Sequence, residues 1–203
     1  QSAGEVGFLG MQVAERFGGA GVDDFRFNAI IAQEAMRVGL AGYCLAITIH
    51  NDVCVPCLVR YASEEQQARW LPGTVSGEVI TSFAAEPLVD VGDVISAERT
   101  TDGWLVNGSI GGVANGTTAD IIIMAVHTGP RGRQADVSLG VIERTMPGLR
   151  RGRKLSLLGS HAQDVCELIL EDVELPDANV LGPPGGGQRL LEPCLLYTSP
   201  SPR

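Results

Sequence analysis

The chain has 203 residues, of which 44% are hydrophobic and 19% are charged. This composition suits a chain that buries a core and argues against disorder, while the net charge of -9 argues against a nucleic-acid-binding surface. The five cysteines are scattered and odd in number, and Gln1–Gly10 does not resemble a secretory signal, so we expect reduced thiols and a cytoplasmic location.

Residues 1–78 carry the patterns of helices. The glycine cluster Phe17–Gly21 lacks the G-x-G-x-x-G spacing of a phosphate-binding turn, so it predicts a plain loop. Apolar residues then recur at intervals of three and four, which predicts a helix with one apolar face. The residues of this face are Phe27, Ile30, Ile31, Ala35 and Val38.

A long apolar run, Ala41–Ala62, follows and could be mistaken for a membrane span. His50, Asn51 and Asp52 lie in its middle, where burial in a bilayer would be costly. We therefore expect a buried central helix and no membrane span. Ser63–Gln66 has the sequence of a capping box, and we expect it to open a short helix that runs through Trp70 and is ended by Pro72.

From residue 79 the pattern changes to short strands separated by Gly, Pro and Asp. The predicted strands are Val79–Ala85, Trp104–Asn107, Asp120–His127, Val137–Glu143 and Val165–Val173. Asn107-Gly108 predicts a tight turn, and Asn115-Gly116 marks a second break, so we expect a polar, glycine-rich connection between two strands here. Several short strands of this kind predict a small sandwich or barrel.

The fold class is therefore α+β, with three segments along the chain. We expect an all-helical domain over residues 1–78, a β-domain over residues 79–187, and over residues 188–203 the start of a truncated helix with an artefactual tail. The sequence Tyr197–Arg203 cannot continue a helix and resembles a translated sequencing adapter. We interpret Cys194–Arg203 as an artefact at the end of a truncated helix and exclude it from the fold analysis.

Four segments together resemble the acyl-CoA dehydrogenases. They are Glu15–Gly21, Tyr61–Pro72, Trp104–Asp120 and Leu158–Gly182, and the resemblance extends over about residues 4–191. The central segment, WLVNGSIGGVANGTTAD, is similar to the family's W-x-(L/V)-N-G-(T/S)-K-x-(W/F)-I-(T/S)-N-G-x-x-A-D pattern. The resemblance implies a helical domain, a middle β-domain and a C-terminal four-helix bundle, of which we expect only the first two here.

The resemblance also implies a function. Acyl-CoA dehydrogenases are FAD-dependent oxidoreductases that remove the α-proton of an acyl-CoA and pass the β-hydride to the flavin. In most members the base lies in the C-terminal bundle, and no position of this chain matches it, so no catalytic residue is named. The implied partners are an acyl-CoA substrate, an electron-transfer protein and, for the full-length protein, further copies of itself.

The implied cofactor site departs from the family pattern. The resemblance assigns flavin contacts to Phe83, Ala84, Ala85, Gly112, Val113 and Ala114, and it assigns substrate contacts to Gly92 and Asp93. Ala85 and Ala114 stand where the family has hydroxyl residues, and Gly112 stands where it has an aromatic ring. Two hypotheses follow: a fragment of a flavin-dependent dehydrogenase, or a non-catalytic scaffold or binding protein of this family that has lost its flavin.

Other groups of reactive residues carry weaker signals. Cys54 and Cys57 form a C-x-x-C pair without a redox or zinc context, which favours two small buried residues in a helix. The three histidines lie far apart without metal-ligand spacing. A cluster of basic residues could meet a CoA or FAD phosphate, but we favour a solvated loop. Its members are Arg144, Arg150, Arg151, Arg153 and Lys154.

Overall fold

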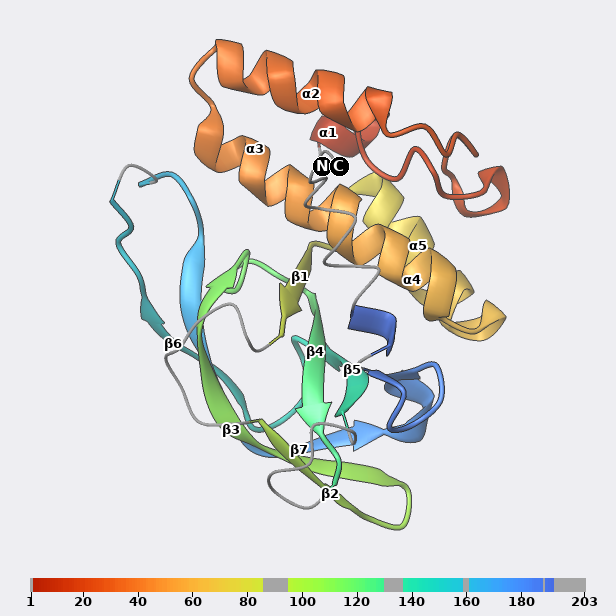
Figure 1. Ribbon diagram of the computed structural model, residues 1–203, viewed down its shortest axis with the longest axis vertical. Helices are drawn as coiled ribbons and strands as arrows, with labels where there is room; N and C mark the ends of the chain where they lie inside the picture. Colours follow the sequence, from red (N-terminus) through yellow and green to blue (C-terminus); the bar gives the residue numbers. More distant parts are fainter. Residues whose placement is uncertain (1, 86–94, 130–136, 159–160, 188, 192–203) are drawn as a thin grey trace.

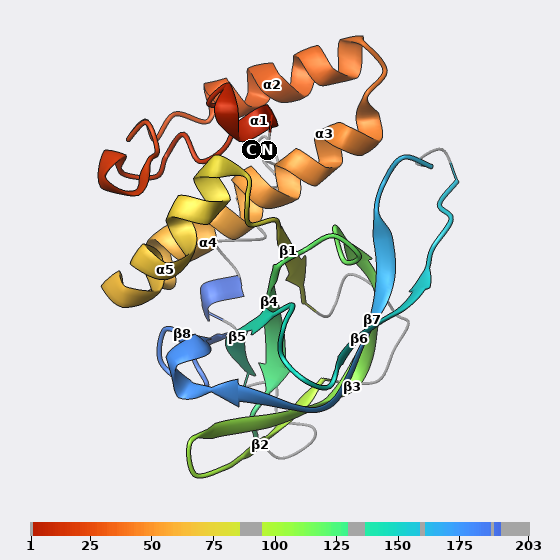
Figure 2. The ribbon, with the colours of Figure 1, turned by 180° about the vertical axis from the view of Figure 1, so that it is seen from behind.

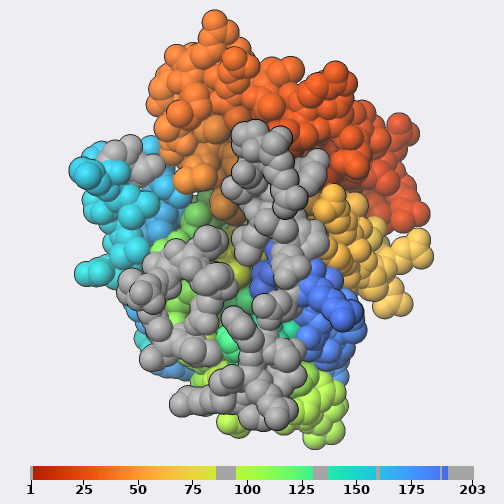
Figure 3. Space-filling model, viewed as in Figure 1, coloured from red at the N-terminus to blue at the C-terminus, as the bar shows by residue number. Residues whose placement is uncertain are grey.

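The computed structural model describes residues 2–85, 95–129, 137–158, 161–187 and 189–191. The helices of the first part of the chain gather on one side, and the strands form a strongly curved sheet beneath them (Figures 1 and 2). Figure 3 shows the same division at the surface, where the red-to-yellow N-terminal residues make up the upper part of the molecule. The α+β class predicted from the sequence is confirmed.

The helical layer contains one long central rod. In it, α3 continues through a π-helical segment into α4, and α2 and α5 lie beside the rod. The helical elements are α1 (Ser2–Glu5), η1 (Glu15–Phe17), α2 (Arg26–Arg37), α3 (Ala41–Thr48), η2 (Ile49–Cys54, the π-helical segment), α4 (Val55–Tyr61) and α5 (Glu64–Ser76). Residues 187 and 189–191 are also helical.

The central rod, Ala41–Tyr61, is long and apolar enough to cross a membrane by length and composition alone. Half of its most apolar stretch is buried inside the protein, which is also typical of the core helix of a soluble protein. Its second half is the better buried, because Val55, Cys57 and Leu58 of α4 are fully enclosed. Cys54 and Cys57 are buried in this rod, as predicted.

The start of α5 was predicted correctly and its end was not. Ser63 accepts a hydrogen bond from the Gln66 amide while the Gln66 side chain accepts one from the Ser63 amide, so the capping box is confirmed. Pro72 does not end the helix, which continues to Ser76 and stops at Gly77 in the left-handed conformation. The buried side chains of Trp70, Leu71 and Thr74 hold both sides of the proline in place.

The apolar face of α2 exists but lies outside the core. None of the residues of α2 is buried, and Ile30 and the following Val38 are 56% and 70% exposed. An apolar periodicity predicts which residues share a face of a helix, but it cannot show what covers that face.

The sheet combines eight strands in the order β6-β7-β3-β2-β4-β5-β8, with β1 added beside β4. All neighbours are antiparallel except the pairs β1–β4 and β2–β4, which are parallel. The strands are β1 (Thr81–Ala84), β2 (Ser96–Arg99), β3 (Gly103–Ala114), β4 (Ile121–His127), β5 (Val137–Glu143), β6 (Leu149–Lys154), β7 (Val165–Pro176) and β8 (Val180–Leu181); the short 3-10 helix η3 (Asp177–Asn179) precedes β8.

The central segment differs from its sequence-based prediction. Asn107-Gly108 is not a turn, because β3 runs without interruption from Gly103 to Ala114. The pairing of β3 with β7 shifts register there, and Asn107 forms two hydrogen bonds with Asp172 on the opposite strand. The extra residue of this irregularity lies on β7, opposite Asn107, so the Asn-Gly pair that would suit a hairpin lies inside a continuous strand. The break at Asn115-Gly116 is confirmed, since Asn115 begins a turn at φ 59.

Two buried clusters hold the fold together. One fills the inside of the curved sheet, where β3 and β7 face β4 and β5, and it contains Val106, Ile122 and Leu168. The other joins the sheet to the helices and contains Leu58, Leu71 and Ile123. Because Ile122 and Ile123 are adjacent on β4, that strand is buried on both faces, as its unbroken apolar sequence predicts.

Candidate functional site

The structure brings the two predicted cofactor segments together. Strand β1, which contains Phe83 and Ala84 and is followed by Ala85, contacts strand β3, which ends with Gly112–Ala114. One direct link fixes this arrangement: Ser82 Oγ donates a hydrogen bond to the Ala114 carbonyl at 2.6 Å. The segments are about thirty residues apart in sequence, so their meeting is a result of the fold.

Burial along the two segments follows the strand period. On β3, Val113 is buried in the interior of the sheet, whereas Gly112 and Ala114 are only half-buried. On the β1 side, Ala84 joins the same interior, while Phe83 and Ala85 pack in the core beneath the helices. Small residues therefore lie at the partly open end of β3, and the Phe83 ring packs in the core.

Gly112 has a backbone conformation that explains its identity. Its φ is 72, in the left-handed region that L side chains rarely adopt, and the register between β3 and β7 shifts between Ile110 and Val113. An aromatic side chain, as the family pattern has here, would strain this backbone. The loss of the ring is therefore coupled to a bulge in the strand.

Asn115 connects the candidate site to the helical layer. Its side-chain Nδ2 donates to the Ala46 carbonyl of α3 at 3.0 Å and to the Thr81 carbonyl of β1 at 3.2 Å. The residue is buried, so both hydrogen bonds are protected from water. Its signal in the sequence was only that of a turn, and this bridging role could not be predicted from the turn signal alone.

His50 makes a second connection between the layers. Its Nε2 lies 3.0 Å from the Thr74 carbonyl, and its Nδ1 lies 2.9 Å from Thr81 Oγ1. Because a carbonyl only accepts, Nε2 carries the proton and Nδ1 accepts. Burial lowers the pKa of His50, so the ring is neutral, and it holds the first residue of β1 against α5.

Three further predictions concern the substrate contacts, the basic cluster and metal binding. Gly92 and Asp93, the expected substrate contacts, lie outside the described residues. Most of the basic cluster forms strand β6, so its interpretation as a solvated loop is wrong. Among the described residues, no group of three or more His, Cys, Asp or Glu side chains could hold a metal ion.

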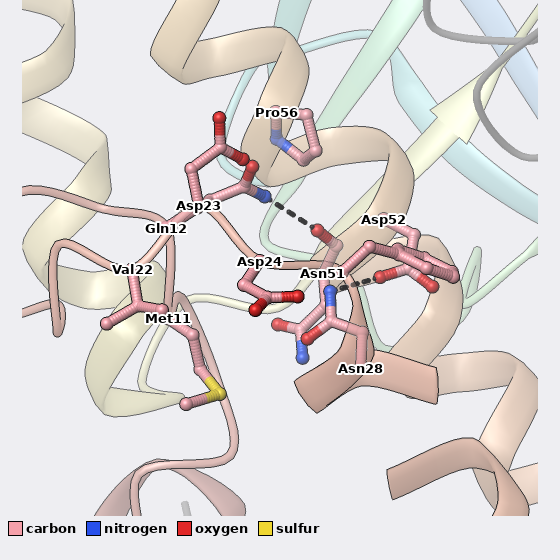
Figure 4. Close-up of a pocket in the computed structure, with 10 residues that line it drawn as sticks. Met11, Gln12, Val22, Asp23, Asp24, Asn28, Asn51, Asp52 and Pro56 are labelled. Carbon is pink, nitrogen blue, oxygen red and sulfur yellow. Dashed lines mark hydrogen bonds between the residues drawn. The ribbon is translucent and has the colours of Figure 1, made fainter. Parts of the chain in front are cut away.

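A separate polar pocket lies within the helical part of the molecule (Figure 4). Asn28 of α2 donates to Asp52 Oδ1 across it, and Gln12 donates to the Asn51 carbonyl. Burial raises the pKa of Asp52 to about 6, an effect that the hydrogen bond from Asn28 partly opposes. The pocket is lined by α2, the π-helical part of the central rod and the segments around Gln12 and Asp24.

Comparisons with known proteins agree with this architecture. The family model of the acyl-CoA dehydrogenase N-terminal domain matches residues 1–78. Glutaryl-CoA dehydrogenase of Desulfococcus multivorans is 33% identical over 202 residues, which are 96% of this chain and 51% of the relative. The chain thus spans about half the length of this curated relative.

Solved structures give the same result for the whole described fold. An acyl-CoA dehydrogenase from Geobacillus kaustophilus has a TM-score of 0.89 and 37% identity, covering 97% of this chain and 53% of that one. An acyl-CoA dehydrogenase complexed with FAD from Bacillus anthracis has a TM-score of 0.86 and 27% identity, covering 97% of this chain and 34% of that one. The chain therefore belongs to the acyl-CoA dehydrogenase family.

Proposed function

We propose that this chain provides the flavin-facing strands of an FAD-dependent acyl-CoA dehydrogenase, an enzyme that introduces an α,β double bond into an acyl-CoA thioester and passes the electrons on to an electron-transfer protein. One observation carries the proposal. Two separate segments that resemble the family's flavin-contact motifs meet at one place, joined by the hydrogen bond from Ser82 Oγ to the Ala114 carbonyl at 2.6 Å.

The residues where the two segments meet are small enough to admit a flat ring. Gly112 and Ala114 are small and half-buried, so a planar ligand can approach the backbone of β3 closely. Val113 between them points into the core and fixes the strand from behind. The hydroxyl contacts of the family pattern are missing, so backbone amides and carbonyls would supply the polar contacts.

Each segment would then contact a different part of the flavin ring. The backbone around Ala84 and Ala85 would hold one edge of the ring, and Gly112 and Ala114 would form the floor beneath it. Asn115 and His50 would keep the two strand ends in register with the helices. Bound FAD would supply the hydride acceptor, and we assign no catalytic base to this chain.

The test is flavin retention by the purified chain. The protein is incubated with FAD, desalted, and examined by visible absorption together with the released flavin content. A near-stoichiometric yellow protein is the expected result, because backbone contacts remain at the site. A folded protein that keeps no flavin would contradict the proposal.

The second candidate function is a scaffold of the same family without flavin. It is favoured by Ala85 and Ala114, which lack the hydroxyls that the family pattern places there. Losing each such hydrogen bond removes on the order of 1 kcal/mol of binding free energy. The variant Ala85→Thr/Ala114→Thr discriminates the two: if wild type is colourless and the variant binds FAD, loss of the hydroxyls explains the scaffold. If both remain colourless, the missing hydroxyls are not the obstacle.

A further inference from the structure

The turn that follows the candidate flavin floor is held by a single carboxylate. Asp164 Oδ2 accepts hydrogen bonds from the amides of Thr117 and Thr118, at 3.1 and 3.0 Å, and from Thr118 Oγ1 at 3.0 Å. The Asp164 main-chain carbonyl also accepts from the Asn115 amide at 2.7 Å. One residue therefore satisfies four donors within the four residues after Ala114.

The carbonyls of the same turn are held by two guanidinium groups. Arg151 donates to the carbonyls of Gly116 and Ala119, at 3.3 and 2.9 Å. Arg144 donates to the carbonyls of Thr117, Thr118 and Ala119. This turn connects two strands. Its amides are held by one carboxylate and its carbonyls by two guanidinium groups.

Asp164 is itself fixed by the packing around it. It follows Ala162 and Gln163, against which Gly42 of α3 packs so closely that an added Cβ would lie 2.9 Å from atoms of both residues. Burial raises the pKa of Asp164, but hydrogen bonds from Thr117 and Thr118 and the charge of Lys154 outweigh it, so the net pKa is lowered and the group is ionised. A fixed charge is therefore directed at the turn.

We propose that Asp164 is a positioning residue for the flavin-binding end of β3. By holding residues 115–118, it keeps Asn115 in its bridge to β1 and keeps the backbone of Gly112–Ala114 in the shape that the ligand meets. This inference rests on the proposed function and adds a residue outside both flavin-contact segments. It matters because the missing hydroxyl contacts leave ligand binding dependent on backbone geometry.

The experiment compares three substitutions by two readouts. Asp164→Ala removes the acceptor, Asp164→Asn keeps an oxygen for the turn amides, and Asp177→Ala is the matched control, because it removes an exposed carboxylate paired with Arg99 beyond the far end of β7. The first readout is amide hydrogen exchange of residues 113–118 without flavin. The second is the FAD dissociation constant of the folded fraction, measured by flavin fluorescence.

Asp164→Ala is expected to speed exchange across residues 113–118 and to weaken FAD binding about tenfold, the loss expected when a charge-assisted hydrogen bond is removed. Asp164→Asn is expected to restore most of the slow exchange and most of the FAD affinity, and Asp177→Ala is expected to leave exchange and affinity unchanged. If Asp164→Ala fails to fold, Thr118→Val removes one of the three bonds to the carboxylate and is expected to change both readouts in the same direction by a smaller factor.

Two results overturn the inference: exchange in the turn that is the same in Asp164→Ala and wild type, or faster exchange with unchanged FAD affinity. Wild-type protein that binds no FAD overturns the proposed function instead. In that case the exchange comparison still decides whether Asp164 holds the turn, so the two failures are distinguished.

Discussion

At the scale of single residues, the half-buried Asp52 and the buried His50 depend on pH in opposite ways. Asp52 has a pKa raised to about 6 by burial, so the fold favours its protonated form. His50 has a lowered pKa, also because of burial, so the fold favours its neutral form. Both lie in the π-helical segment η2, where the wider turn places polar side chains inside an apolar rod.

Replacing Asp52 with Asn is expected to stabilise the protein above pH 6 and to change little below pH 4. A raised pKa contributes stability that is fully present below the unfolded pKa near 4 and is lost as pH rises through about 6. After allowance for partial exposure, we expect a gain of about 1 kcal/mol at pH 7.5. Urea unfolding of both proteins from pH 4 to 8 measures it. A difference that does not depend on pH would contradict this account.

At the scale of secondary-structure elements, the sequence predicted those elements whose patterns are purely local. The capping box of α5 and the apolar strands β4 and β5 were predicted within one or two residues. Strand β6 was missed because Arg150, Arg151, Arg153 and Lys154 dominate it, and it is held by pairing with β7 rather than by apolar alternation. The two-residue β8 is likewise defined by a partner distant in sequence, whereas the missed strand β2 pairs with the adjacent strand β3.

The candidate site shows the same limit. The two flavin-contact segments could be proposed from their resemblance to family motifs, but the bulge at Gly112 could not. A positive φ leaves no mark in the sequence beyond the glycine itself, and Asn107-Gly108 shows that a pair typical of turns can lie inside a continuous strand. Asp164 and Asn115 act through hydrogen bonds that only the tertiary structure reveals.

Substitutions at the end of β3 test the bulge directly. We expect Gly112→Trp to lower the free energy of unfolding by about 1 to 2 kcal/mol, because the left-handed backbone strains any L side chain. Ala114→Thr, two residues on in an extended strand, is expected to change it by less than about 0.5 kcal/mol. Chemical denaturation of both variants measures the difference. Equal stabilities would show that Gly112 does not hold this conformation in solution.

At the scale of the whole molecule, a few buried polar links fix the helical layer on the sheet. His50 connects α5 to Thr81 of β1, and Asn115 connects the end of β3 to α3. Both links end at the strands that form the candidate site. The apolar core between the layers stabilises their association, and these hydrogen bonds fix the position of the strand ends relative to the helices.

His50→Ala is expected to lower the free energy of unfolding at pH 7.5 by about 3 kcal/mol, since it leaves a cavity and removes the partners of Thr74 and Thr81. Burial lowers the pKa of His50 in the folded protein. The stability that the wild-type side chain contributes is therefore present above the unfolded pKa near 6.5 and is lost as the pH falls through the folded pKa. Urea unfolding from pH 5 to 8 should show the difference shrinking in acid. His161→Ala, at an exposed histidine, is the control and should have little effect.

The most direct test of the central claim is to locate FAD on the chain. Amide resonances of the isotope-labelled protein are recorded during titration with FAD. We expect saturable shifts confined to Phe83–Ala85, Gly112–Ala114 and their immediate neighbours, with the polar pocket near Asp52 unaffected. Shifts elsewhere, or none at saturating FAD in a folded protein, would contradict the claim that these two strand ends form the flavin site.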